Sequence, residues 1–286
     1  MFSWLTDWMR EGLIEGIMAR FVGLYDTINA EVNSIAGNVG QTPGEFNPGV
    51  FGMIRTLSET AIIPVAGMIL TFVLCYELIQ LIIEKNNMVE FDTFNLYKWI
   101  FKTFCAVFIL THTFDIVMGI FALAQNTINL SAGVITGSID ISVDAALATL
   151  DAQLQAMGIW ELLGLWLETW LISICLWVLT ICIFVIIYGR MIEIYLVVSV
   201  APIPLSTMVN REYGQIGSNY LKSLFALAFQ GFLIMVCVAI YATLVQNIPM
   251  AGNIHFAIWI TVAYTILLTF ALFKTASLSR SLFSAH

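Results

Sequence analysis

Ionisable side chains inside long apolar stretches are the residues of this chain that could do chemistry, because a charge in such a stretch is costly. His112 and Asp115 lie three residues apart on one helical face, where they could hydrogen-bond and relay a proton. They also fall near one end of their stretch, where a mutually satisfied polar pair needs no transport role. Glu77 and Glu168 are single acids that could line a water-filled path or pair with a neighbouring helix or subunit.

A second group of polar and proline residues follows the third apolar stretch. Arg190 and Glu193 are three residues apart, and an interfacial ion pair between them is the simplest interpretation. Pro202 and Pro204 come next, and each lacks a backbone donor, so regular helix should break there. Lys222 opens the following apolar stretch. We expect Arg190, Glu193 and the two prolines to set a bend at the cytoplasmic face.

The composition excludes soluble enzymes and soluble binding domains. Of the 286 residues, 60% are hydrophobic and only 10% are charged, and the mean hydropathy is +0.91. A soluble chain needs roughly 25% charged residues to cover its surface. The net charge of -8 also argues against a broad nucleic-acid surface, which requires clustered Lys and Arg. The sequence therefore predicts a membrane protein in which any contact with nucleic acid is local, transient or indirect.

Sequence motifs of enzymes and cofactor sites are absent. The chain has no glycine-rich phosphate loop, no HExxH and no GxSxG motif, and its three histidines are scattered. Its five cysteines all lie in apolar runs, where they are expected to be small packing residues. We expect neither enzymatic activity nor a bound cofactor or metal.

Long apolar runs predict an all-α polytopic fold. A helix needs about 20 residues to cross the hydrocarbon core of a bilayer. Five stretches meet this length, at 61–83, 96–124, 162–189, 220–245 and 255–273. The sixth apolar stretch, 191–209, contains both Pro202 and Pro204, and we interpret it as a re-entrant or interfacial element that bends without crossing.

The N-terminal region is more polar and predicts an amphipathic helix. Over residues 3–21 the apolar side chains, Trp4 and Trp8 among them, recur every three or four positions. Tryptophans on one face suit a helix lying in the membrane interface, whereas Gly12 and Gly16 could let two helices pack closely. Residues 37–52 are rich in Gly and Pro and are predicted to form a loop.

The distribution of Lys and Arg predicts the orientation, since short cytoplasmic loops collect these residues. They occur in and near the loops that would share one side, at Lys85, Lys98, Arg190, Arg211, Lys222, Lys274 and Arg280. Residues 125–161 contain none. This asymmetry places the C-terminus in the cytoplasm and the N-terminus outside. It predicts four segments: an exported region 1–60, two spans in 61–124, an exported acidic loop 125–161, and a C-terminal bundle 162–286 with a cytoplasmic tail.

The acidic loop has two patterns. Polar and apolar residues alternate over 138–143, which is typical of an extended strand. From Asp144 onward the apolar residues follow helical spacing, so a short amphipathic helix is expected.

The C-terminal half resembles TrbL-type subunits, the polytopic inner-membrane channel components of conjugation and type IV secretion machines. The residues that carry the resemblance are Arg190, Glu193, Leu196, Ala201 and Pro202, then Tyr220, Leu221, Lys222, Ala226 and Gln230, and finally Lys274. The N-terminal half agrees in plan only. The resemblance implies a scaffold and channel subunit that helps DNA–protein substrate cross the cell membrane. It also implies partner subunits, including separate ATPases, because the chain has no nucleotide-binding motif.

Two functional hypotheses remain at this point. In the first, copies of the chain form a homo-oligomer, with Gly12, Gly16, Trp4 and Trp8 at the contacts between N-terminal helices, because one copy leaves little room for a polymer. In the second, the chain is a small secondary transporter or ion channel, and the ionisable residues of the apolar stretches lie on its pathway.

Overall fold

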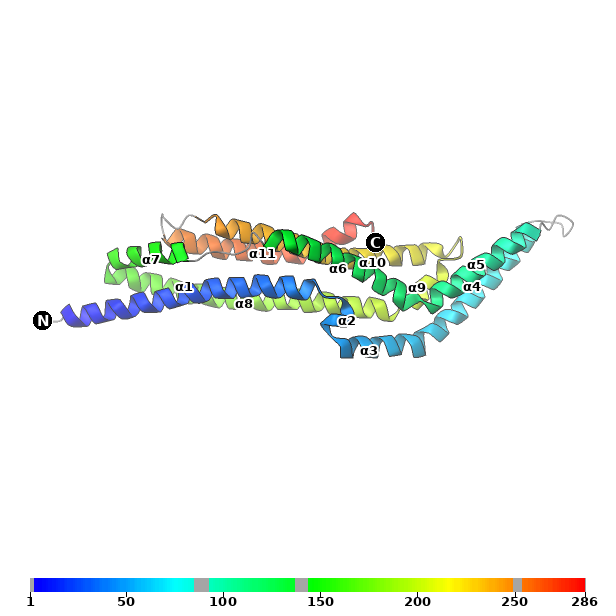
Figure 1. Cartoon of the computed structure of the whole chain (residues 1–286), viewed down its shortest axis with the longest axis horizontal. Helices are drawn as coiled ribbons and strands as arrows, with labels where there is room; N and C mark the ends of the chain where they lie inside the picture. Colours follow the sequence, from blue (N-terminus) through cyan, green and yellow to red (C-terminus); the bar gives the residue numbers. More distant parts are fainter. Residues whose placement is uncertain (1–2, 85–92, 137–143, 249–253, 286) are drawn as a thin grey trace. The chain divides into compact units, whose positions relative to one another are not determined.

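The computed structural model describes residues 3–84, 93–136, 144–248 and 254–285, and every regular element in these ranges is helical (Figure 1). The helices are α1 (Ser3–Val39), α2 (Pro43–Phe46), α3 (Pro48–Leu57), α4 (Ile63–Glu84), α5 (Thr93–Thr111), α6 (Thr113–Thr136), α7 (Asp144–Ala156), α8 (Ile159–Ser199), α9 (Pro202–Thr207), α10 (Gly214–Gln246) and α11 (Ile254–Leu282), with a π-helical turn at Ser58–Ile62 between α3 and α4. The all-α prediction is confirmed. The expected strand at 138–143 and the residue Lys85 lie outside the described ranges.

Within the described residues, four helices are long and apolar enough to cross a membrane, and the number is five if a bent pair of helices counts as one span. The four cover Pro48–Ile83, Ile159–Ser199, Gly214–Gln246 and Ile254–Leu282. They include the predicted first, third, fourth and fifth spans. The chain is thus a multi-pass membrane protein. The helix expected after Asp144 is also present, as α7.

The predicted second span, 96–124, is wrong as a single helix. It is divided into α5 and α6, and the direction of the helix changes by 68° between them. Three consecutive polar side chains account for the bend. Thr111 and Thr113 donate to the carbonyls of Val107 and Ile109, each at 3.0 Å, and the His112 ring nitrogen Nδ1 lies 3.0 Å from the Phe108 carbonyl. Such side-chain bonds to the preceding turn compete with the backbone ladder and bend helices.

The stretch 191–209 breaks where the prolines predict, but its first half was wrongly separated from the third span. Residues 191–199 continue α8, a helix of 41 residues that is about 60 Å long at 1.5 Å per residue. The chain then bends into α9, which has six residues and starts at Pro202. Six helical residues cover about 9 Å, far less than the hydrocarbon core. The segment therefore forms no additional span-length helix.

The loop predicted at 37–52 is also wrong, because α1 ends at Val39 and two short helices follow. Thr42 and Glu45 form a reciprocal capping box at the start of α2, and the Asn47 side chain accepts from Val50 N–H at 3.0 Å to start α3. Pro43 and Pro48 occupy the first helical positions, where a missing N–H costs nothing. The Thr42 backbone N–H and hydroxyl donate to the Glu45 carboxylate and lower its pKa below the ordinary value.

The helices divide into two compact units, each with its own core. The first unit contains residues 1–40, 128–188 and 232–275, and the second contains 41–127, 189–231 and 276–286. Four helices, α6, α8, α10 and α11, contribute residues to both. The predicted segment boundaries at residues 60, 124 and 161 refer to the membrane surfaces, and they stay a prediction.

In the first unit, α1 runs beside α8 (Figure 1). Its buried face recurs every three or four residues and consists of Ile17, Phe21, Tyr25, Ile28, Val32, Ile35 and Val39. These side chains share one apolar cluster with α8 residues such as Leu165, Ile172 and Ile183. The amphipathic pattern of the N-terminal region thus finds a partner surface within the chain, and the helix extends far beyond the predicted end at residue 21.

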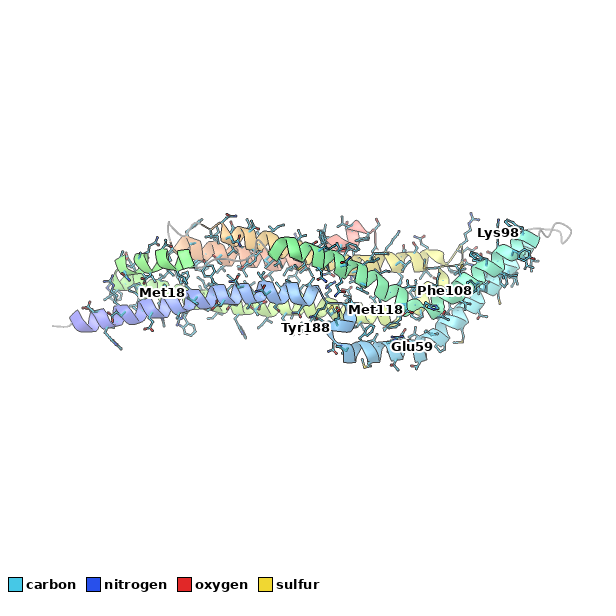
Figure 2. The ribbon with its side chains drawn as sticks, in the orientation of Figure 1. Met18, Glu59, Lys98, Phe108, Met118 and Tyr188 are labelled. Carbon is cyan, nitrogen blue, oxygen red and sulfur yellow. The ribbon has the colours of Figure 1, made fainter. Side chains whose placement is uncertain are left out.

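In the second unit, α4 and α5 form an antiparallel hairpin against which α9 packs (Figure 1). Ala66, Leu70 and Leu74 of α4 meet Ala106 and Leu110 of α5, and Ile203 and Val209 pack on the same cluster. Lys98 and Phe108 mark the course of α5 in Figure 2. The hairpin of α4 and α5 therefore holds α9 and the bend that precedes it.

Candidate functional site

Arg190 is the most unusual residue of the second unit, because it is a buried cation without an acidic partner. Only 6% of its surface is exposed. Its Nη2 donates to the carbonyls of Leu227 and Ala228 on α10 at 3.4 and 3.5 Å, which are long contacts. Its Nε and Nη1 have no hydrogen-bond partner among the described residues. A buried guanidinium with unused donors can donate hydrogen bonds to a carboxylate or phosphate oxygen.

The predicted ion pair between Arg190 and Glu193 is wrong. Glu193 pairs instead with Arg280 near the end of α11, and both side chains are partly exposed. One turn of α8 separates the two residues, and Arg190 turns toward α10 while Glu193 turns toward α11. Ser279, beside Arg280, donates to the Ala226 carbonyl at 2.5 Å. These contacts tie α8, α10 and α11 together at one level of the second unit.

The bend at Pro202 and Pro204 is seated on α10 by two close backbone approaches. A Cβ atom at Gly217 would lie 2.6 Å from the Pro204 carbonyl oxygen, and one at Gly214 would lie 3.0 Å from that of Met208. Glycine is therefore required at Gly217. Tyr220 also donates from its hydroxyl to the Val197 carbonyl at 3.1 Å. The predicted role of the two prolines in shaping this region agrees with their position.

A third contact joins α8 to the segment before α3. Tyr195 is buried, and its hydroxyl donates to the Pro43 carbonyl at 2.8 Å. Gln125 of α6 donates to Glu45 at 2.7 Å in the same unit. Lys222 is half-buried and makes no ion pair with any described residue. Lys222 therefore takes no part in the hydrogen bonds described for Arg190.

The single acids of the apolar stretches have local partners. Glu77 of α4 pairs with Lys102 of α5, and Glu168 of α8 lies 2.6 Å from the His255 ring on α11. Neither partner was predicted, because each lies on another helix. Glu212, which the sequence analysis did not single out, accepts from Tyr76 and Gln80 of α4 at 3.1 and 2.9 Å.

His112 and Asp115 do not form the pair that their spacing allows. The His112 ring stacks on Phe108 at 4.2 Å, and its Nδ1 lies 3.0 Å from Thr111 Oγ1. Within the described ranges, no hydrogen bond joins His112 to Asp115. His112 therefore takes part in the bend between α5 and α6 rather than in a chain of titratable groups.

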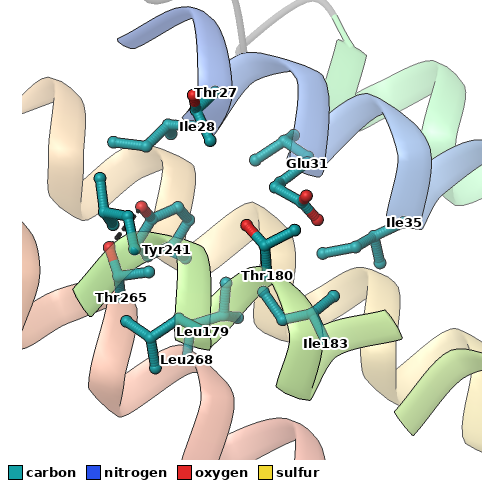
Figure 3. A pocket seen from close by; sticks show the side chains of 12 residues that line it. Thr27, Ile28, Glu31, Ile35, Leu179, Thr180, Ile183, Tyr241, Thr265 and Leu268 are labelled. Carbon is teal, nitrogen blue, oxygen red and sulfur yellow. Dashed lines mark hydrogen bonds between the residues drawn. The ribbon is translucent and has the colours of Figure 1, made fainter. Parts of the chain in front are cut away.

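Glu31 of α1 is a half-buried acid that the sequence analysis missed, because residues 1–60 were placed outside the bilayer. Figure 3 shows its carboxylate turned toward Thr180 of α8, from which it accepts a hydrogen bond. Tyr241 and Thr265 hydrogen-bond to each other at 2.9 Å across the same cavity. The cavity has a volume of about 20 Å³, enough for one water molecule.

The glycines predicted to mediate oligomerisation differ in their surroundings. A Cβ at Gly16 would contact the Trp166 side chain at 3.6 Å, whereas nothing lies within 4 Å of one at Gly12. Trp8 is 69% exposed. Trp4 belongs to α1, but its side chain lies outside the described part of the structure. Gly16 thus serves packing within the chain, and Gly12 and Trp8 remain open to a partner.

Comparison with known proteins gave one match. A family model described as TrbL/VirB6 plasmid conjugal transfer like protein matches residues 28–202, which is more than half of the chain. The matched range contains Arg190, Glu193 and Pro202 but ends before Pro204 and Lys222. Searches of curated proteins and of solved structures found no match.

Proposed function

Because the chain belongs to the TrbL/VirB6 family of plasmid conjugal transfer proteins, we propose that it is a scaffold and channel subunit of a conjugative type IV secretion complex. Family membership and the apolar helices make it a membrane component of conjugal transfer. In the proposal, copies of the chain form a homo-oligomer in the cytoplasmic membrane. The oligomer helps DNA–protein substrate cross, and separate ATPase subunits supply the energy.

The family match is the observation that carries this proposal, and the contacts of the ionisable residues support it. Glu77 forms an ion pair with Lys102, and the Glu168 carboxylate lies 2.6 Å from the His255 ring, each partner on a neighbouring helix. A small transporter or ion channel requires titratable groups that face a continuous pathway, and these pairs instead tie helices together. The secondary-transporter hypothesis is therefore the weaker of the two.

The proposed orientation places the N-terminus outside and the C-terminus in the cytoplasm, and cysteine labelling tests it. Single cysteines replace Glu11, Ser138 or Ser284 in a chain whose native cysteines are removed. We expect an impermeant thiol reagent to label positions 11 and 138 in intact cells, and position 284 only after permeabilisation. If position 11 is labelled like position 284, the chain crosses the membrane an even number of times and the five-span arrangement is wrong.

The proposed function predicts that a single surface substitution can prevent formation of the oligomer while the chain still inserts into the membrane. Gly12→Leu adds bulk at an exposed position of α1 where the chain itself offers no clash. Because a leucine at Gly12 would hold two packed α1 helices apart, this variant should lower the particle mass in mild detergent and abolish conjugative transfer. Its membrane abundance should match that of the wild type. Gly37→Leu, at another exposed and open position of α1, is the control.

A strain without the gene, complemented by each variant, provides the transfer assay. Normal transfer without the gene would overturn the proposed function. A strictly monomeric wild-type particle in several mild detergents and in lipid discs would overturn the homo-oligomer, and transport of a small solute by that monomer would favour the transporter hypothesis.

A further inference from the structure

A groove runs between α1 and α8 in the first unit. Its volume is about 460 Å³, and its lining residues are Ala19, Arg20, Gly23, Leu24 and Thr27 of α1 with Ser173, Leu176, Trp177 and Thr180 of α8. The hydroxyls of Thr27 and Ser173 donate to carbonyls of their own helices, at 2.7 and 2.8 Å. The groove therefore presents a largely apolar wall with one charged group.

That charged group is Arg20. Its guanidinium lies over the rings of Trp166 and Trp170, with centroid distances of 4.7 and 4.4 Å. It also donates to the Trp166 carbonyl at 3.4 Å. In the described part of the chain, no carboxylate forms an ion pair with it. The planar cation is fixed by two aromatic faces but is not neutralised.

The sequence of α8 indicates the depth of this cation in the membrane. Between Glu168 and Arg190 the chain has 21 uncharged residues, which span about 32 Å as a helix and match the hydrocarbon core. Trp166 and Trp170 lie at the start of this run, where amphipathic tryptophans mark the interface. Arg20, stacked on them, is at headgroup level, and the groove continues from it beside Ser173, Leu176 and Thr180 into the core.

We propose that this groove is a specific binding site for an anionic phospholipid. The phosphate binds the guanidinium of Arg20, and one acyl chain lies in the groove beside Leu176 and Trp177. The guanidinium can bind the phosphate of either lipid class with charge-assisted hydrogen bonds. Arg20 selects an anionic over a zwitterionic lipid because the choline cation of a zwitterionic headgroup is repelled by the guanidinium. Gly23 keeps the groove open, since nothing lies within 4 Å of a Cβ at this position.

Native mass spectrometry of the full chain in mixed micelles tests the site. The micelles contain equal amounts of phosphatidylglycerol and phosphatidylcholine, and bound lipids are counted for each variant. We expect the wild type to retain phosphatidylglycerol over phosphatidylcholine by about tenfold, because only phosphatidylcholine brings a second cation beside Arg20. Arg20→Gln should bring this ratio close to one.

Two matched glycine variants separate the groove from the charge. Gly23→Leu fills the groove while improving helix propensity, so both lipids should be lost and the melting temperature kept. Gly37→Leu makes the same change at an exposed position of α1 outside the groove and should retain the wild-type ratio.

Three outcomes would overturn the proposal. The first is equal retention of the two lipids by the wild type, and the second is an unchanged ratio in Arg20→Gln. The third is a Gly23→Leu protein that dissociates into single chains while it retains lipid as the wild type does. In that case the groove is an interface between copies of the chain.

Discussion

Arg190→Met is expected to keep or raise the stability of the purified protein while it abolishes conjugative transfer. The side chain is 6% exposed, its two hydrogen bonds are long, and two of its nitrogens have no partner within the described residues. Methionine of similar length removes the desolvated charge without leaving a large cavity. Replacing buried charged groups by hydrophobic ones is often neutral or stabilising by about 1–4 kcal/mol. A thermal unfolding series in detergent measures this difference.

We expect the loss of transfer because burying a charged side chain costs free energy, and residues kept at such a cost usually have a function. A buried guanidinium whose two hydrogen bonds are long, and which lies at the end of the uncharged run of α8, is a functional candidate by default. We expect its unused donors to bind an acidic group of another subunit or of the substrate. Arg190→Lys keeps the charge but not the planar set of donors, so transfer should be partly retained.

Arg190→Ala is the matched control, because it removes the same charge but leaves a cavity that should lower stability. If Arg190→Met instead melts well below the wild type, the contacts with the Leu227 and Ala228 carbonyls hold α8 on α10 and the role is structural. Wild-type transfer from a stable Arg190→Met protein would remove Arg190 from the functional site.

The features that could be predicted from the sequence are those encoded locally. The length of an apolar run decides whether a helix can span the bilayer, and the five predicted stretches all fall within span-length helices or the bent pair. The break at Pro202 follows from a missing backbone donor. Neither requires knowledge of a distant partner.

Two local signals were present but misinterpreted. Residues 42–49, TPGEFNPG, contain two helix starts, each with a capping side chain followed by proline. The loop was predicted from the Gly and Pro content of this segment, although proline also favours the first position of a helix. The run Thr111, His112 and Thr113 could have predicted the bend between α5 and α6, since each side chain can bond to the preceding turn.

The partners of the charged residues could not be predicted from one sequence. Glu193 and Arg280 are 87 residues apart, as are Glu168 and His255. The spacing of Arg190 and Glu193 shows only that they are one turn apart on α8. Which neighbouring helix each side chain meets depends on the packing of α10 and α11.

Gly217→Ala is expected to destabilise the protein strongly for so small a change. Its Cβ would lie 2.6 Å from the Pro204 carbonyl oxygen, a backbone atom that cannot rotate away as a side chain can. α9 would have to move away from α10, and such overpacking costs about 1–3 kcal/mol. The melting temperature should fall by about 2–4 °C for each kcal/mol, and transfer should fall with it because α9 shapes the bend at Pro202.

The same substitution at Gly119, Gly119→Ala, is expected to raise the stability of the protein instead of lowering it. Nothing lies within 4 Å of a Cβ at Gly119, which is an exposed position in the interior of α6. Alanine there should stabilise by about 0.5–1 kcal/mol, since glycine loses more backbone entropy on folding. Equal melting temperatures for the two variants would show that α9 is not seated closely on α10. A stable Gly217→Ala protein with normal transfer would show further that the bend tolerates displacement of α9.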